Sequence, residues 1–317
     1  MTAKEKYIKW NETEKTIPVF SRSWWLNVVC GTEGWDVFLV EDKGTIVGAL
    51  PYYKRGQGII SMPLYTQTMG PWLCVEDKDM KYTSVLALRQ KRLTQLIEQL
   101  KDFPHIYMRC SSKLTDWLPF YWQGYQQTTR YTYLLPKLTN TKEIWDGMSV
   151  NLRRNIKKAQ NKYQLTVQKG VSIENLIRLQ ESSFERQHHS FEGNKELLSE
   201  LITVSRQRQQ GDIWGAYDTN GVLHAAAFVV WQKQCAYYLA GGSDTKLRHT
   251  NAHALVLWQV IQEIASKSES FDFEGSMLSG VERYFREFGA LQTPYFQLEK
   301  GKLNLFHRIL LKLQQNL

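Results

Sequence analysis

The length, composition and charge of this chain exclude several classes of protein. Its 317 residues, 43% hydrophobic and 22% charged, are typical of a soluble globular protein with room for two domains, and the net charge of +9 favours an anionic partner. No apolar run is long enough to span a membrane, and the charged N-terminus is unlike a signal peptide. The scattered cysteines form no CxxC pair, so we expect no bound metal and a reducing, cytoplasmic location.

The first half of the chain predicts one α/β unit. A short helix is expected at Trp24-Trp25, and a β-hairpin over 37–50. A loop rich in proline and glycine leads to Gly70-Pro71, and a helix follows with four apolar residues at helical spacing, namely Leu93, Leu96, Ile97 and Leu100. The unit closes near Leu135-Pro136, so we predict the first domain over residues 1–136.

The second half predicts a longer unit over residues 137–317. Ser149 is the expected N-cap of a helix, and a strand at 165–167 follows it. The remaining predicted elements are helices over 172–187 and 195–209, a hairpin over 213–231, a strand over 235–240, a turn at 241–243 and a helix over 252–266. The last helix is apolar almost all round, so we expect it to be buried.

The two halves end in the same pattern. With an offset of 165, Phe271–Leu298 aligns without gaps on Ile106–Tyr133. Identical residues match at Ser276 and Ser111, at Phe285 and Phe120, and at Gly289 and Gly124. Each copy predicts a strand, an aromatic-rich helix, a glycine and another strand. Self-similarity at a fixed, domain-sized offset indicates a duplicated α/β unit.

Two carboxylates near the end of the second copy are candidate catalytic groups. Asp272 and Glu274 alternate with two phenylalanines, so in a strand they share one face. Buried carboxylates are costly unless they are paired or used, and Gly275 would let a ligand or backbone come close. Each acid is also compatible with a structural role, bonded to an arginine or a helix N-terminus. The first copy has Tyr107 and Arg109 at these positions, which suggests one active unit and one diverged unit.

Basic residues of the second half are candidates for binding phosphate. From Asn151 to Gly170 there are six lysines or arginines and no acid, and Asn151 and Asn155 share one side of the predicted helix. Gly241-Gly242-Ser243, followed by a basic stretch and a helix start, resembles an anion site at a helix N-terminus. A solvated basic face and a tight turn are the structural alternatives.

Two further patterns are weaker. His188-His189 would be acid/base candidates, although adjacent histidines on a polar loop are more often surface residues. The residues from Lys302 to Leu317 have the pattern of a basic amphipathic helix, which either contacts a membrane surface weakly or docks on the protein. No P-loop, HExxH or Ser–His–Asp arrangement is present.

An ordered set of motifs resembles the FemAB-like branch of the GCN5-related N-acetyltransferase (GNAT) superfamily. The similar segments of the second half are Trp145–Ala159, Gly241–Asn251, Leu257-Trp258, Asp272–Ser276 and Phe285–Gly289. In the first half, Trp24-Trp25, Val47–Pro51 and Gly70-Pro71 also fit. The chain also departs from the family: Arg286 replaces the usual lysine, and the long charged helical hairpin of some tRNA-using members is missing. Glu274 replaces the usual glycine, and the stretch 246–252 lacks the glycines of the coenzyme loop of ordinary GNAT enzymes.

The resemblance implies a fold and an activity. The fold would be α/β (α+β), with two tandem GNAT-like domains, each a mixed, mostly antiparallel sheet flanked by helices. The activity would be acyl or aminoacyl transfer to an amine, such as that of a cell-wall precursor. The donor would be acyl-coenzyme A or aminoacyl-tRNA, used as a co-substrate without a permanently bound cofactor. The alternative is a non-catalytic protein that binds a nucleotide or RNA on the same scaffold.

The resemblance and the residue patterns together select the expected site. Glu274 or Asp272 would take the proton of the amine. The expected donor-binding residues are Asn151, Arg154, Asn155, Lys158, Gly241, Gly242, Ser243, Arg248, Asn251, Ser276 and Arg286.

Overall fold

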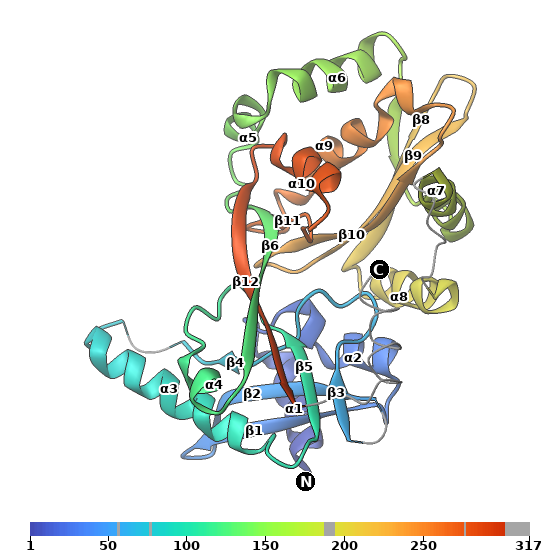
Figure 1. The fold of residues 1–317 in the computed structure, drawn as a ribbon. Helices are drawn as coiled ribbons and strands as arrows, with labels where there is room; N and C mark the ends of the chain where they lie inside the picture. The colour runs from blue at the N-terminus through green and yellow to red at the C-terminus, as the bar shows by residue number, and fades with distance from the viewer. Residues whose placement is uncertain (56–57, 76–77, 187–193, 276, 302–317) are drawn as a thin grey trace. The chain divides into compact units, whose positions relative to one another are not determined.

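The computed structural model describes residues 1–317 except 56–57, 76–77, 187–193, 276 and 302–317 (Figure 1). It divides into two compact units. One unit consists of Met1–Arg130 together with the chain from Pro294, and the other consists of Tyr131–Thr293. The strand that ends the second half of the sequence therefore contributes to the first unit.

The first unit is a mixed sheet flanked by helices. Its helices are α1 (Ala3–Thr13), η1 (Val19–Ser21), α2 (Ser23–Cys30), α3 (Tyr82–Glu98) and α4 (Leu118–Trp122). Its strands are β1 (Trp35–Asp42), β2 (Thr45–Lys54), β3 (Ile59–Ser61), β4 (Trp72–Leu73), β5 (His105–Arg109) and the end of β12 (Leu291–Gly301). The strand order is β1-β2-β3-β5-β12, with β4 paired to β2. The β3–β5 pair is parallel, and the other pairs described in this unit are antiparallel.

The second unit repeats this architecture. Its helices are α5 (Thr141–Gly147), α6 (Val150–Asn161), α7 (Ile173–Arg186), α8 (Lys195–Gln207), η2 (Arg248–Thr250), α9 (Ala252–Ile264) and α10 (Ser279–Arg286). Its strands are the end of β6 (Gln126–Leu135), β7 (Thr166–Lys169), β8 (Gly211–Tyr217), β9 (Leu223–Trp231), β10 (Ala236–Ser243) and β11 (Phe271–Asp272). The order is β6-β11-β10-β9-β8-β7, and only β10–β11 is parallel among the pairs described here. The predicted fold class is confirmed.

Local sequence patterns account for the helices that support the second sheet. The hydroxyl of Ser149 accepts a hydrogen bond from the backbone N–H of Leu152 at 3.0 Å, as expected of an N-cap. Leu152, Ile156 and Ala159 form the buried stripe of α6. Helix α9 is buried as predicted, with nine buried side chains over its 13 residues. It packs between α6 and the face of β8 and β9, so its apolar surface forms the centre of the core.

The duplicated segments exchange their last strands. Strand β6 of the first copy and β12 of the second occupy matching positions in the repeat, as do α4 and α10. Leu134 and Leu135 of β6 pair with β11, whereas Gln297–Gly301 of β12 pair with β5. The last strand of each copy therefore pairs with the strand that precedes the aromatic-rich helix of the other copy (Figure 1). Across the described part of the chain, no helix has both the length and the apolar character needed to cross a bilayer.

Candidate functional site

The parallel strands β10 and β11 separate after a short common stretch. Ala236 pairs with Phe271 and Tyr237 pairs with Asp272, after which β11 ends while β10 continues to Ser243. A register shift in the β9–β10 ladder, between Tyr238 and Ala240, falls at the same level. In α/β folds, ligands bind outside the carboxyl ends of parallel strands where the chain diverges. The carboxyl end of the β10–β11 pair is the centre of the candidate site.

Asp272 and Glu274 lie at the end of β11. Phe271 and Phe273 are buried in the core, as the alternation predicts, and Asp272 is only 7% exposed. The Asp272 carboxylate accepts hydrogen bonds from the hydroxyl of Thr132 and, at 2.7 Å, from the backbone N–H of Glu274. The strand is shorter than the predicted alternation, because regular pairing stops at Asp272.

The chain turns sharply after Phe273. Glu274 and Gly275 have φ angles of +60° and +54°, in the left-handed region. A Cβ atom on Gly275 would lie 2.2 Å from the carbonyl oxygen of Tyr131, so only glycine fits there. Glu274 has a side chain, so its left-handed conformation costs about 1–2 kcal/mol. Backbone strain at a candidate catalytic residue is a reason to suspect a function.

Tyr237 lies near the carboxylates of Asp272 and Glu274. It is in register with Asp272 across the parallel pair, so both side chains leave the sheet on the same face. Burial raises the pKa of Tyr237 well above its usual value, and Cys235, Asp272 and Glu274 raise it further. We call Tyr237, Asp272 and Glu274 the strand-end cluster. The sequence alone does not identify Tyr237, because the register of β10 with β11 leaves no local sequence pattern.

A hydrogen-bonded chain of three side chains lies on the opposite face. The hydroxyl of Tyr238 is 3.0 Å from Nε2 of His253, and the hydroxyl of Tyr284 is 3.0 Å from Nδ1. Burial lowers the pKa of His253 to about 4, so the imidazole is neutral at pH 7. A neutral ring donates from one nitrogen and accepts at the other. One tyrosine therefore donates to the ring, and the other accepts from it and keeps its own proton for a third group.

The glycines of the predicted anion-binding turn have a different conformation. The predicted turn is wrong, because Gly241, Gly242 and Ser243 lie in β10 and pair with Ala227, Ala226 and Ala225. A Cβ atom on Gly242 would lie 2.3 Å from the carbonyl oxygen of Leu179. The backbone N–H of Ser243 also donates to the hydroxyl of Ser183 at 3.1 Å. These residues let α7 approach the strand closely.

Helix α9 begins after this strand with an open N-terminus. Asn251 is its N-cap, with a φ of +58° and no side-chain hydrogen bond to the helix. The exposed N–H groups of a first turn attract anions. The preceding η2 carries Arg248, which is exposed. Two of the predicted donor-binding residues, Arg248 and Asn251, therefore lie together here.

The end of α6 brings further positive charge to η2. The ring of His249 lies 5.5 Å from the ring of Tyr163, in an edge-to-face contact. The ammonium groups of Lys158 and Lys162 each lie 5.6 Å from the centre of the same Tyr163 ring. We call Lys158, Lys162, His249 and Arg248, with Tyr163 between them, the basic patch. The tertiary structure thus brings Lys158 to the side of η2, as donor binding requires.

Other predicted residues lie in separate contacts. At the start of α6, the guanidinium of Arg154 donates to the side-chain oxygen of Asn151 at 2.7 Å, and Asn155 is half-buried. On α10, Nε of Arg286 lies 3.3 Å from the carboxylate of Glu282, which accepts a hydrogen bond from Tyr133 at 2.8 Å.

Several predictions fall outside the described residues. These are Ser276, His188-His189 and the amphipathic segment from Lys302 to Leu317. Within the part of the chain that the structure describes, no group of three or more histidine, cysteine, aspartate or glutamate side chains could hold a metal ion.

Comparison with known proteins assigns the second unit. Residues 148–286 match the family model of the acetyltransferase (GNAT) domain. This part of the second unit is therefore similar to a GNAT acetyltransferase domain. The matched GNAT domain contains β10, β11, α9 and α10, and therefore the strand-end cluster and the basic patch. No curated protein sequence matches the chain.

The FemX-like fold extends over nearly the whole chain. The crystal structure of FemX is 11% identical, with a TM-score of 0.68 over 93% of this chain and 96% of that one. A conserved protein of unknown function from Bacteroides thetaiotaomicron is 11% identical, with a TM-score of 0.59 over 95% and 98%. L-PGS from Bacillus licheniformis is 12% identical, with a TM-score of 0.55 over 98% and 96%. At these identities the likeness shows the fold alone.

Proposed function

We propose that the GNAT domain transfers an acyl group from an activated donor to an amine. The observation that carries this proposal is the position of Asp272 and Glu274 at the carboxyl end of the parallel pair β10–β11. The match of residues 148–286 to the GNAT domain model supports acyl transfer as the reaction class. Acyl-coenzyme A is the first donor to test, and aminoacyl-tRNA is the second. The amine of a cell-wall precursor is one acceptor that the resemblance to FemAB-like proteins implies.

The chemistry needs little from the protein beyond positioning and proton transfer. The amine nitrogen bonds to the carbonyl carbon of the donor, and the bond from that carbon to sulfur, or to a ribose oxygen of tRNA, breaks. The amine loses a proton, and the leaving thiolate or alkoxide gains one. Glu274 is our candidate for the group that takes the amine proton, directly or through water. Asp272 is a positioning residue, because its carboxylate accepts the backbone N–H of Glu274.

The basic patch and the N-terminus of α9 are the proposed site for the donor's phosphates. Lys158 and Arg248 supply charge, and the first turn of α9 supplies backbone N–H groups and the positive end of its dipole. We place the reaction in the cytoplasm, where thiols stay reduced, since none of the four cysteines forms a disulfide bond.

A binding experiment tests the donor. The melting temperature of the full chain is measured with acetyl-coenzyme A, longer acyl-coenzymes A, free coenzyme A and bulk tRNA. Stabilisation by a coenzyme A species supports thioester chemistry. Stabilisation by tRNA alone favours aminoacyl transfer when an aminoacyl group is consumed, and RNA binding without chemistry when it is not. Silence from every donor contradicts the proposal.

Charge-reversal variants locate the donor. Lys158→Glu and Arg248→Glu should each weaken binding of the stabilising ligand by about tenfold, since each replaces attraction to phosphate by repulsion. Lys157→Glu is the matched control, because Lys157 lies on the same helix and faces Trp145 at 5.9 Å instead. Equal losses in all three variants would indicate non-specific attraction to a basic face and would overturn the assigned site.

A second pair of variants tests Glu274. Glu274→Gln keeps the size of the side chain and removes the base, so turnover with an amine acceptor should fall by about 10²- to 10⁴-fold while donor binding is unchanged. Glu274→Gly should fold at least as stably, because glycine adopts the left-handed backbone without penalty. A glutamine variant with full turnover would exclude Glu274 as the base.

A further inference from the structure

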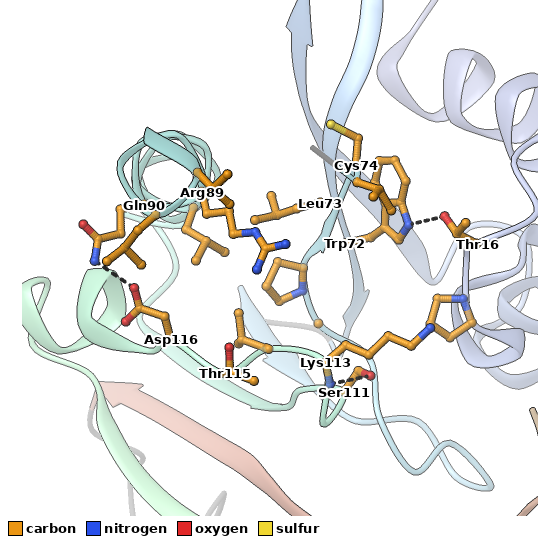
Figure 2. Close-up of a pocket in the computed structure, with 18 of the residues that line it drawn as sticks. Thr16, Trp72, Leu73, Cys74, Arg89, Gln90, Ser111, Lys113, Thr115 and Asp116 are labelled. Carbon is orange, nitrogen blue, oxygen red and sulfur yellow. Dashed lines mark hydrogen bonds between the residues drawn. The ribbon is translucent and has the colours of Figure 1, made fainter. Parts of the chain in front are cut away.

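The first unit contains a cavity of about 560 Å³ that lies wholly among its own residues. It is bounded by α3, by β4 and by the loop that follows β5, over 111–118 (Figure 2). This volume is within the range of about 300–1,000 Å³ that is typical of small-molecule sites. The site proposed above for acyl transfer uses none of these residues.

The cavity lies beside the segment that follows β5, and the duplication relates this segment to the chain after β11 in the second unit. The parallel pair β3–β5 corresponds to β10–β11, since each is the one parallel pair described in its unit. The loop 111–118 follows β5 as the chain after β11 follows its strand, at the offset of the duplication. The carboxyl end of the parallel pair is where such folds bind ligands. The first copy has Tyr107 and Arg109 in place of the acid pair, and neither residue lines the cavity, so we propose binding there without the acyl-transfer chemistry.

The walls of the cavity are mainly apolar. One face of α3 lines it at helical spacing, with Tyr82, Val85, Leu86, Arg89, Gln90 and Leu93. Leu73 of β4 and Leu114 of the loop lie on other sides. The rim is apolar as well, since Val75, Tyr82 and Leu118 are 75%, 77% and 43% exposed. Large apolar side chains left in water around an apolar cavity indicate a ligand with a hydrocarbon part.

Two positively charged side chains, Arg89 and Lys113, line the cavity. Figure 2 shows the guanidinium of Arg89 reaching from α3 into the space between Leu73 and Thr115. Lys113 also lines the cavity, and it forms no ion pair among the described residues. The single acid of the lining, Asp116, accepts hydrogen bonds from the side chain of Gln90 at 2.8 Å and from the backbone N–H of Leu118 at 2.9 Å. The lining therefore favours an anion over a cation.

We propose that this cavity binds an anionic amphiphile, a ligand with one hydrocarbon chain and a negatively charged headgroup. The chain lies against Leu73, Leu86 and Leu114, and the headgroup lies at Arg89 and Lys113. The ligand is either a free carboxylate of this kind or the equivalent part of an anionic phospholipid. The proposal is independent of the acyl-transfer chemistry, because every residue that it uses lies in the first unit.

Three probes of equal chain length test the chemistry. Sodium decanoate, decanol and decyltrimethylammonium are titrated into the full chain below the concentrations at which they aggregate, and binding is measured by calorimetry. Decanoate should bind at least about fivefold more tightly than the other two, since a partly exposed ion pair contributes about 1 kcal/mol. Equal affinities, or no binding of any probe, would overturn the proposal. If inorganic phosphate alone displaced decanoate, the affinity would come from the charged headgroup and not from the hydrocarbon chain. That result would also overturn the proposal.

Two variants and a control locate the site. Leu86→Trp fills the cavity and should abolish decanoate binding, and its melting temperature shows whether it folds. Lys113→Glu changes an exposed side chain and should reverse the preference, so that decyltrimethylammonium binds more tightly than decanoate. Lys91→Glu is the matched control on α3, since Lys91 is exposed and does not line the cavity. Unchanged decanoate binding in Lys113→Glu would overturn the proposal even if Leu86→Trp does not fold.

A vesicle arm distinguishes the two sources of the ligand. The chain is sedimented with vesicles of phosphatidylglycerol and, in parallel, of phosphatidylcholine, with and without Leu86→Trp. Sedimentation with phosphatidylglycerol that Leu86→Trp abolishes identifies a lipid ligand. Decanoate binding without sedimentation identifies a free amphiphile.

Discussion

Asp272 accepts a hydrogen bond from the backbone N–H of Glu274 at 2.7 Å, and Glu274 has a left-handed backbone with a φ of +60°. A side-chain oxygen bonded to the N–H two residues later is a local turn that aspartate favours. The bond ends β11 and directs the chain away from β10. The two acids of one short motif therefore have different roles. Asp272 fixes the backbone turn, and Glu274 lies within that turn.

The structural role of Asp272 can be measured as stability. Asp272→Ala removes a buried acceptor of two hydrogen bonds and should lower the free energy of unfolding by about 2–3 kcal/mol. Thr132→Val removes one of the two donors and should lower it by about 1 kcal/mol. Urea unfolding of both variants provides the measurement. If Asp272→Ala is as stable as wild type, the carboxylate is not what holds the turn.

Replacement of Gly242 by alanine should lower stability, whereas the same replacement of Gly280 should not. Gly242→Ala should destabilise the protein by about 3 kcal/mol, because the new Cβ atom would lie 2.3 Å from the carbonyl oxygen of Leu179 and α7 would have to move. Gly280→Ala is the control, since a Cβ atom there meets nothing within 4 Å and alanine favours the helix by about 0.5–1 kcal/mol. Thermal unfolding compares the two. Equal stability of both variants would mean that β10 and α7 are not in close contact.

The half-buried His253 predicts a loss of stability in acid. Its pKa is lowered to about 4 in the folded chain, and the ordinary value of about 6.5 applies in the unfolded chain. The unfolded chain therefore binds a proton first as the pH falls, and the stabilisation that is present above pH 6.5 is lost between about pH 6.5 and 4. We expect a loss of about 2 kcal/mol, less than full burial implies because the ring is half-buried. Urea unfolding at pH 7 and pH 4.5 measures it.

His253→Gln is the control for this pH dependence. Glutamine can still meet the hydroxyls of Tyr238 and Tyr284, but it does not titrate. The variant should lose about 2 kcal/mol less than wild type between the same two pH values. An identical loss in both proteins would assign the acid sensitivity to other groups.

The sequence by itself determined the features that depend on short-range periodicity. The N-cap of α6, the buried α9, the alternation of Phe271 and Phe273 with the two acids, and the duplicated segments are all visible in the order of residues. Each follows from backbone geometry within a few residues, since a helix repeats every 3.6 residues and a strand every two.

Only the tertiary structure decided the features that join distant segments. Glycine adopts both a tight turn and a close-packed strand, so the close approach of α7 to Gly242 could not be predicted from the glycines themselves. The contact of His253 with Tyr238 and Tyr284 needs three elements to meet on one face of a sheet. Likewise, the pairing of β12 with β5 was decided by the tertiary structure, because the residues of one strand do not determine which distant strand it pairs with.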